Sequence, residues 1–462
     1  MLLANFAAQT KFEQIPEKVI HEAKRTLIDS LGCGLAATQT EKGRICVEFA
    51  RRLGGPPEAT IMGAGYLVPS PSAAFANAEL IVDLDFDTLL CPPHLSPAVI
   101  SASLAAAESL GLSGADFLTA LVVGLEVGSR IGTSVSGLWG MWFERGMRFE
   151  RGIGFEPVSV YIGMGHTVFG AAASVSKILG FDGMRIANTF GIASQFVPAP
   201  TTAKFLNTPH SPMYKYALLG ACAQAGVMAA LLTQLGYTGD MTILDGDTTN
   251  PEICDWERLT RGLGEKWLHV EQAFGFKPYP VCRVQHSLLD AFLSIVSENN
   301  LTPEDIASVV VKGSPSCLVP LRKNRDIRSP YDAQFSVPYA IAVAAYLPKP
   351  SPKWTSPETI KDPKILKFMD KVRVEVIEGI GLGGYVKITT NKGKIFEKEA
   401  KIPKGSPVEG FRMTDKELEE KFYTNASGIL SNENMRKILT VIYDLDRLKN
   451  IRELTRLLTI EK

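Results

Sequence analysis

The chain has 462 residues, of which 45% are hydrophobic and 21% charged, a composition typical of a globular protein with more than one domain. Lysine plus arginine and aspartate plus glutamate each number 49, so no excess of charge favours binding to nucleic acid or a membrane. Seven cysteines lie singly, without metal-ligand spacing, which indicates a reducing compartment. The N-terminal segment lacks the features of a signal peptide, and no apolar run reaches the roughly 18 residues of a spanning helix. We therefore expect a cytoplasmic protein.

Helical periodicity dominates the first 268 residues. Apolar spacing predicts helices over 16–35, 41–53, 70–81, 97–110, 116–131, 159–179, 184–195 and 211–235. Ser113 is the expected N-cap of the fifth of these helices, with Asp116 at the capping-box position. The segment 59–68 is predicted to be extended, and we interpret its Gly63-Ala64-Gly65 as a turn because the third glycine of a nucleotide-binding loop is missing.

The sequence pattern changes near Leu268. Strands are predicted at 306–312, 371–377, 385–390 and 394–400, the last two joined as a hairpin, and helices at 287–298 and 337–346. From Thr414 the helical period returns. The predicted fold class is mainly α: a large all-helical domain (1–268 plus 409–462) with an inserted smaller α+β lid domain (269–408). The cleft between them is the expected ligand site.

An acidic stretch, NAELIVDLDFDTLLCPPHLS, lies between two Ala-rich segments that are predicted to be buried helices. Its polar residues include Asp83, Asp85, Asp87, Thr88 and His94. Buried acids are costly unless they are paired or used, and the Pro-Pro step should end the helix and fix a loop. The alternative is a helix end with solvated acids. The aspartate spacing resembles a calcium loop, but the required glycine and closing glutamate are absent, so we expect no metal site.

Several strings in this order resemble the MmgE/PrpD family, which includes 2-methylcitrate dehydratase, cis-aconitate decarboxylase and iminodisuccinate epimerase. They are EATIMGAGYLVPSPSAAFANAELIVDLDFDT, HLSPAVISASLAAAE, SGADFLTALVVGLEVGSRIG, GAAASVSKILG, YKYALLG, FKPYPVCRVQHSLLDA and DAQFSVPYAIA. The resemblance covers nearly the whole chain. It implies a helical domain, a smaller α+β lid, a homodimer, and cofactor-free chemistry on small di- or tricarboxylic acids.

The resemblance also implies site residues. The matching positions are Asp85, Thr88, His94, Lys215, Lys277, His286 and Tyr339. One position departs from the family, which often has a histidine nine residues before the glycine of the GAAA run. Counting back from Gly170 reaches Tyr161, whereas His166 lies four residues before that glycine. Either Tyr161 replaces the family histidine or His166 serves instead.

These residue types suit the removal of water from a hydroxy acid, which needs a base near a carbon-bound proton and an acid near the leaving hydroxyl. His94 is the natural candidate, and Asp85 would orient it or bind substrate. Lys215 and Lys277 would stabilise the charge that develops on a substrate carboxylate, and Arg283 would add bidentate carboxylate recognition.

Each of these residues also has a structural alternative. Most lysines lie on the surface, although Lys215 falls in an apolar segment that is predicted to be helical. His286 would serve equally well at a helix start, and Tyr339 as a core residue. Cys91 and Cys282 lie near candidate positions, but a nucleophilic role would need an activating base.

Three hypotheses follow. The first is a cofactor-independent hydratase or dehydratase that abstracts a proton next to a carboxylate of a 2-methylcitrate-like di- or tricarboxylic acid. The second is a decarboxylase or epimerase on the same scaffold. The third, motivated by Tyr161, is a non-catalytic homodimer that binds carboxylates. None of the three involves a cofactor, nucleic acid or membrane.

Overall fold

The computed structural model describes residues 1–88, 94–135, 164–198, 207–245, 256–268, 270 and 275–459. Helix accounts for 58% of the structure and strand for only 9%, so the protein is mainly α as predicted. Among the described residues, no helix combines the length and the apolar composition that a membrane span requires.

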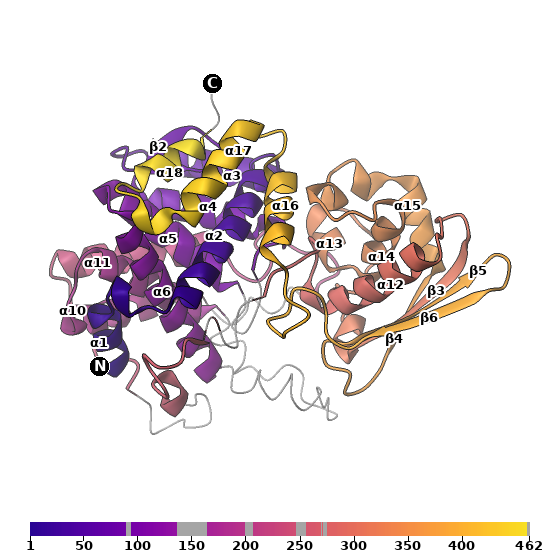
Figure 1. The fold of residues 1–462 in the computed structure, drawn as a ribbon, viewed down its shortest axis with the longest axis horizontal. Coiled ribbons are helices and arrows are strands. Elements are labelled where there is room, and N and C mark those ends of the chain that lie inside the picture. The colour runs from indigo at the N-terminus through magenta and orange to yellow at the C-terminus, as the bar shows by residue number, and fades with distance from the viewer. Residues whose placement is uncertain are drawn as a thin grey trace.

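Helices from the first half of the chain surround the larger of two main hydrophobic cores. They are α1 (Leu2–Gln9), α2 (Glu17–Ala37), α3 (Glu41–Leu53), α4 (Ser70–Asp83), α5 (Leu95–Leu110), α6 (Gly114–Val135), α9 (Gly165–Ile178), α10 (Gly183–Ala193) and α11 (Leu219–Gln234). A short hairpin of β1 (Ala59–Ile61) and β2 (Tyr66–Val68) connects α3 to α4. Figure 1 shows these indigo to magenta elements gathered on one side of the molecule.

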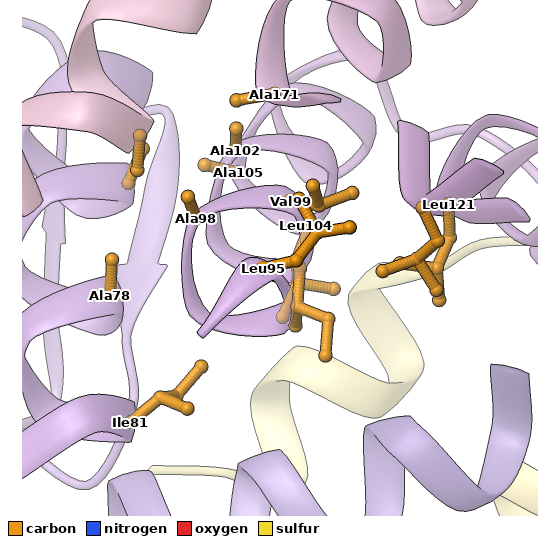
Figure 2. Close-up of a cluster of buried hydrophobic side chains, with 14 of the residues drawn as sticks. Ala78, Ile81, Leu95, Ala98, Val99, Ala102, Leu104, Ala105, Leu121 and Ala171 are labelled. Atoms are coloured by element: carbon orange, nitrogen blue, oxygen red, sulfur yellow. The ribbon is translucent and has the colours of Figure 1, made fainter. Parts of the chain in front are cut away.

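Small residues let the central helices of this core pack closely. Every residue of α5 from Leu95 to Glu108 is buried, and Figure 2 shows its side chains Leu95 and Val99 among those of neighbouring helices. A Cβ added at Gly124 of α6 would lie 2.7 Å from the carbonyl oxygen of Gly170 in α9. Only glycine permits so close an approach of the α6 and α9 backbones, and Val99 of α5 packs against the same glycine.

A second core lies between residues 279 and 388. Its four-stranded sheet has the order β4 (Val372–Val376), β3 (Ile306–Gly313), β5 (Gly384–Thr390) and β6 (Ile395–Ala400). β3 pairs parallel with β4 and antiparallel with β5, and buried residues alternate along β5, as expected for a sheet with one packed face. The helices of this part are α12 (His286–Glu298), α13 (Pro330–Phe335), α14 (Val337–Tyr346) and α15 (Pro363–Phe368).

The C-terminal helices return to the first core. They are α16 (Asp415–Ala426), α17 (Asn432–Tyr443) and α18 (Arg452–Leu457). Phe422, Ile438 and Leu454 are buried in the larger core, and Figure 1 shows these yellow helices lying across the indigo and purple ones. The two cores are therefore formed by different stretches of chain, with the second inside the first in sequence. The exact domain boundaries at 268/269 and 408/409 stay a prediction.

Most predicted elements match the structure, including the helices at 41–53 and 337–346 and the hairpin of β5 and β6. The helix predicted over 211–235 is wrong at its start, because α11 begins only at Leu219. Lys215 has a left-handed φ of 50°, and its amide donates to the carbonyl of Pro212, as in a turn. The predicted helix over 159–179 is described only from Gly165.

Candidate active site

Backbone strain is concentrated at three of the residues that the sequence singled out. Among described residues other than glycine, only Asp85, His94, Lys215 and Asn300 have a positive φ, at 51°, 54°, 50° and 49°. Left-handed backbone costs an L-residue about 1–2 kcal/mol and persists only where the surrounding structure enforces it. Such strain is common at functional sites, and here it occurs at an acid, an imidazole and an ammonium group that lie together.

Asp85 is the centre of this cluster. The Lys277 Nζ lies 3.0 Å from its Oδ2 and also donates to its backbone carbonyl at 2.9 Å, while the Lys215 Nζ lies 3.7 Å from its Oδ1. All three side chains are completely buried. Burial alone would raise the pKa of Asp85, but the charges of Lys277 and Lys215 outweigh it and hold that pKa well below its usual value. Asp85 is therefore a carboxylate between two cations.

Lys215 is held by the end of α4. Its Nζ donates to the backbone carbonyls of Val82 at 2.6 Å and Asp83 at 2.9 Å, and to the Gln334 Oε1 at 3.1 Å. Burial lowers the pKa of Lys215 to about 8, against the opposing charge of Asp85. Its three protons are thus committed to protein oxygens. Lys277 makes fewer contacts and retains an N–H without an acceptor in the described part of the chain.

His94 and Asp87 form a buried pair beside these cations. The His94 Nδ1 lies 2.8 Å from the Asp87 Oδ2, and the imidazole holds the pKa of Asp87 below its usual value despite burial, which acts to raise it. The His94 Nε2 is 3.9 Å from the Asp85 Oδ1 and has no hydrogen-bond partner in the described structure. A carboxylate behind Nδ1 fixes the tautomer in which Nε2 can accept a proton.

Tyr216, which follows Lys215, completes the surroundings of the imidazole. Its ring lies 4.2 Å from the His94 ring between centroids, and it also packs edge-on against Phe335. The pKa of Tyr216 is raised well above its usual value, mainly by burial and secondly by the negative charge of Asp85. Tyr216 therefore remains a neutral phenol beside His94.

The same acids could in principle attract a metal ion, because ligand atoms of Asp85, Asp87 and His94 lie within 4.8 Å of one another. However, Asp85 already faces the ammonium groups of Lys215 and Lys277. A divalent cation would have to displace these charges or tolerate their repulsion. The residues present therefore fit a metal poorly, and they fit an organic anion between the cations and the imidazole better.

Thr88 and His286 have protein partners. The Thr88 hydroxyl hydrogen-bonds to the Ser96 hydroxyl, at the start of α5. The His286 Nε2 lies 3.0 Å from the carbonyl of Val281, and its Nδ1 lies 3.3 Å from the Arg283 Nη1. Burial and the neighbouring Arg283 charge lower the pKa of His286 well below its usual value, so this imidazole is neutral.

One other expected residue lies away from these contacts, and another is not described. Tyr339 belongs to the second core, where its hydroxyl donates to the Trp354 carbonyl at 2.6 Å rather than to the acidic cluster. His166 is buried in the first turn of α9. Tyr161 and Cys91 lie outside the described residues.

Sequence reasoning missed several residues that support the cluster. Tyr216 and Gln334 lie within strings that carry the family resemblance, but nothing in them marks a contact with His94 or Lys215. Lys421 of α16 was missed as well. Its Nζ donates to the Asp29 Oδ1 and the Phe86 carbonyl, each at 2.6 Å, and to the Lys277 carbonyl at 2.9 Å. The sequence around Lys421 gives no indication of its burial, because lysines on amphipathic helices usually face solvent.

Comparison with known proteins now places the chain. The MmgE/PrpD N-terminal domain model matches residues 2–250, and the MmgE/PrpD C-terminal domain model matches residues 279–446. The chain belongs to the MmgE/PrpD family. In this MmgE/PrpD protein, Asp85, His94 and Lys215 fall within the N-terminal match, and Lys277 lies just before the C-terminal match.

Several known proteins are similar to this chain over nearly the full length of both sequences. The human cis-aconitate decarboxylase is 27% identical over 474 residues, covering 97% of this chain and 92% of the relative. The mouse cis-aconitate decarboxylase is 27% identical over 469 residues, covering 97% and 91%. A cis-aconitate decarboxylase of Aspergillus terreus is 23% identical over 491 residues, covering 99% and 95%.

Proposed function

We propose that this MmgE/PrpD protein is a cofactor-independent lyase acting on a small di- or tricarboxylic acid. One observation carries the proposal. The His94 Nε2 is buried and unpaired among the described residues, backed by Asp87, and lies beside two lysines that neutralise Asp85. A positioned imidazole next to fixed cations suits proton transfer at a carbon whose electron pair spreads into a carboxylate.

Decarboxylation of a cis-aconitate-like acid is our first candidate, because the human, mouse and Aspergillus relatives carry that name. In this reaction the bond to one carboxylate carbon breaks and carbon dioxide leaves. The electron pair spreads through the double bond toward a remaining carboxylate, where the Lys277 ammonium stabilises the charge. Protonated His94 then gives its Nε2 proton to carbon, and Asp87 stabilises the imidazolium until that transfer.

Dehydration, the first hypothesis from sequence, uses the same groups. The neutral His94 Nε2 takes the proton from carbon, and the electron pair spreads into the adjacent carboxylate. The resulting imidazolium then gives that proton to the leaving hydroxide, which departs as water. An epimerase would return the proton to the opposite face instead. All three reactions pass through a carbanion next to a carboxylate, so substrate trials must separate them.

The test is turnover of cis-aconitate, followed by carbon dioxide release and proton NMR, and of 2-methylcitrate, followed by absorbance of the conjugated product. We expect decarboxylation, and a loss of about 10²–10⁴-fold in kcat for His94→Gln, because the proton-transfer group is removed. His21→Gln is the matched control, since this histidine is 43% exposed and pairs with Asp415 at the surface.

Two outcomes would contradict the proposal. The first is an inert wild-type protein across tricarboxylic, hydroxy and imino acids, including no solvent deuterium exchange into the substrate. The second is a His94→Gln variant as active as His21→Gln. Carboxylate binding without turnover would favour the non-catalytic alternative.

We also propose a homodimer in a reducing compartment, as the resemblance and the scattered cysteines led us to expect. The described cysteines are Cys33, Cys46, Cys222, Cys282 and Cys317, and all are free and buried. Light scattering of the purified protein tests the dimer.

A further inference from the structure

Among the described residues, the buried cation Arg322 has no acidic partner. Arg322 is 8% exposed, yet its guanidinium forms no ion pair with any described residue. Its Nη1 donates to the Ser316 carbonyl at 3.0 Å, its Nη2 lies 3.8 Å from the Cys282 sulfur, and its Nε has no partner in the described structure. A guanidinium has five N–H donors and is always charged, so leaving it buried and largely unpaired is costly.

The backbone around Arg322 is firmly held. Its amide donates to the Val319 carbonyl at 3.0 Å, and its carbonyl accepts from the Val337 amide at the start of α14 at 2.8 Å. The guanidinium is therefore carried by a fixed piece of chain, as a recognition group requires.

Arg322 lies next to the candidate active site. Its neighbour Cys282 belongs to a small apolar cluster with Leu321 and Phe335, against which Tyr216 packs. Tyr216 in turn lies against the His94 ring. In addition, the Cys282 amide donates to the carbonyl of Gln334, whose side chain holds Lys215. The guanidinium and the imidazole therefore both lie against one connected group of side chains, formed by Cys282, Phe335 and Tyr216.

Arg283, which the sequence suggested as the carboxylate-binding arginine, is occupied elsewhere. It donates to the Lys404 carbonyl at 2.8 Å and the Ser406 hydroxyl at 2.6 Å, and it also contacts His286. These bonds tie Arg283 to the segment after β6. The Nε of each arginine is unpaired among the described residues, but both Nη atoms of Arg283 are bound to protein oxygens, whereas the Nη2 of Arg322 has only the Cys282 sulfur.

We propose that Arg322 binds a substrate carboxylate that is not attached to the reacting carbon, and so determines the preference for tricarboxylic over dicarboxylic acids. This inference rests on the proposed function. A guanidinium matches a carboxylate with two parallel hydrogen bonds, which ammonium groups cannot provide. Lys277 would face the carboxylate next to the carbanion, and Arg322 would hold the middle carboxylate, which a dicarboxylic acid such as glutarate lacks.

Binding of two inert probes tests this assignment without requiring turnover. Tricarballylate carries three carboxylates on a saturated chain, and glutarate lacks the middle one. By calorimetry we expect Arg322→Met to weaken tricarballylate binding by about 10–100-fold, as for loss of a charge-assisted pair, and to change glutarate binding by less than about threefold. Arg322→Lys should fall between wild type and Arg322→Met for tricarballylate. Arg328→Met is the matched control, because the Arg328 side chain is 66% exposed, and it should leave both affinities unchanged.

A thermal measurement separates recognition from a structural role. Without ligand, the unfolding temperature of Arg322→Met should equal or exceed that of the wild type, because a buried unpaired charge has been removed. If Arg322→Met loses stability or fails to fold, or if either Arg322 variant binds tricarballylate like the wild type, the assignment is overturned. If the wild type binds neither probe, the proposed function itself is contradicted.

Discussion

The central charges of the site are each set by their nearest neighbours. Asp85 remains ionised in a dry environment because Lys277 and Lys215 flank it. At Lys215, by contrast, burial outweighs the neighbouring charge and lowers the pKa from 10.5 to about 8, even with Asp85 beside it. A lysine so perturbed should make stability depend on pH in a predictable direction.

We predict that stability rises with pH above pH 8 because of Lys215. Between its folded pKa of about 8 and the unfolded value of 10.5, the unfolded chain binds the extra proton, so the free energy of unfolding increases with pH. Urea denaturation at pH 7.5, 8.5 and 9.5 should show the wild type gaining about 1–2 kcal/mol relative to Lys215→Met across this range.

Lys416→Met is the control for this experiment, because Lys416 is 85% exposed on α16. Its stability should follow the wild type in parallel at every pH. A parallel curve for Lys215→Met as well would mean that the Lys215 ammonium titrates normally in the folded protein.

Residue types and spacing predicted which residues form the candidate active site better than they predicted which of these residues contact one another. The structure brings Asp85, His94, Lys215 and Lys277 together, as expected from the acidic stretch and the resemblance. The partner of the imidazole was not expected to be Asp87, because three aspartates at alternate positions look equivalent in sequence. Only the turn after α4, with Asp85 in a left-handed conformation, distinguishes them.

At the scale of elements, helix α16 acts as a clamp on the site. The Lys421 ammonium donates to the carbonyl of Phe86, which lies between Asp85 and Asp87. It also donates to the carbonyl of the candidate catalytic residue Lys277. The same ammonium pairs with Asp29 of α2 and lies 3.9 Å above the Phe86 ring. One side chain thus holds three segments that are far apart in the chain.

We predict that Lys421→Met destabilises the protein by about 3–5 kcal/mol, because Asp29 is left as a buried acid without its cation. Chemical denaturation measures this loss. In enzyme assays kcat should fall more than KM rises, since the carbonyls that position Asp85, Asp87 and Lys277 are released.

A second substitution distinguishes charge from packing. Adding Asp29→Asn to Lys421→Met should restore part of the stability but not kcat, because the unpaired charge is gone while the clamp is still missing. Lys416→Met, on the same helix, should change neither quantity. Recovery of kcat in the double variant would show that Lys421 acts only through stability.

Periodicity located most elements but failed where tertiary contacts override it. The apolar pattern from 211 to 218 predicts a helix. Instead the segment forms a turn, in which the Lys215 amide donates to the Pro212 carbonyl and the Lys215 ammonium donates to carbonyls at the end of α4. Such long-range contacts leave no local pattern. The sheet, by contrast, was recognisable because β-branched residues alternate with polar ones.

At the scale of the whole molecule, side chains of α13 connect the two main cores. Gln334 bonds to Lys215 and to the Asp83 carbonyl at 2.9 Å, and the Tyr331 hydroxyl donates to the Asp83 Oδ1 at 3.2 Å. These buried polar contacts couple the sheet-containing part to the end of α4. The cooperativity of unfolding should depend on them.

We predict that the double variant Tyr331→Phe with Gln334→Ala separates the unfolding of the two cores. Cutting polar contacts between units with their own cores reduces their coupling, so scanning calorimetry should show two transitions where the wild type shows one. Tyr346→Phe, at the end of α14, is the control and should keep a single transition. A single, merely shifted transition in the double variant would contradict this view.

The return of α16, α17 and α18 to the first core also has a consequence for synthesis. Helix α2 cannot bury its Gly32 against Phe422 until α16 has been translated. At typical elongation rates, translation from residue 270 through α18 takes roughly ten to forty seconds. During that time the nascent chain exposes an incomplete apolar surface, so a truncated message should yield an aggregation-prone product that depends on chaperones.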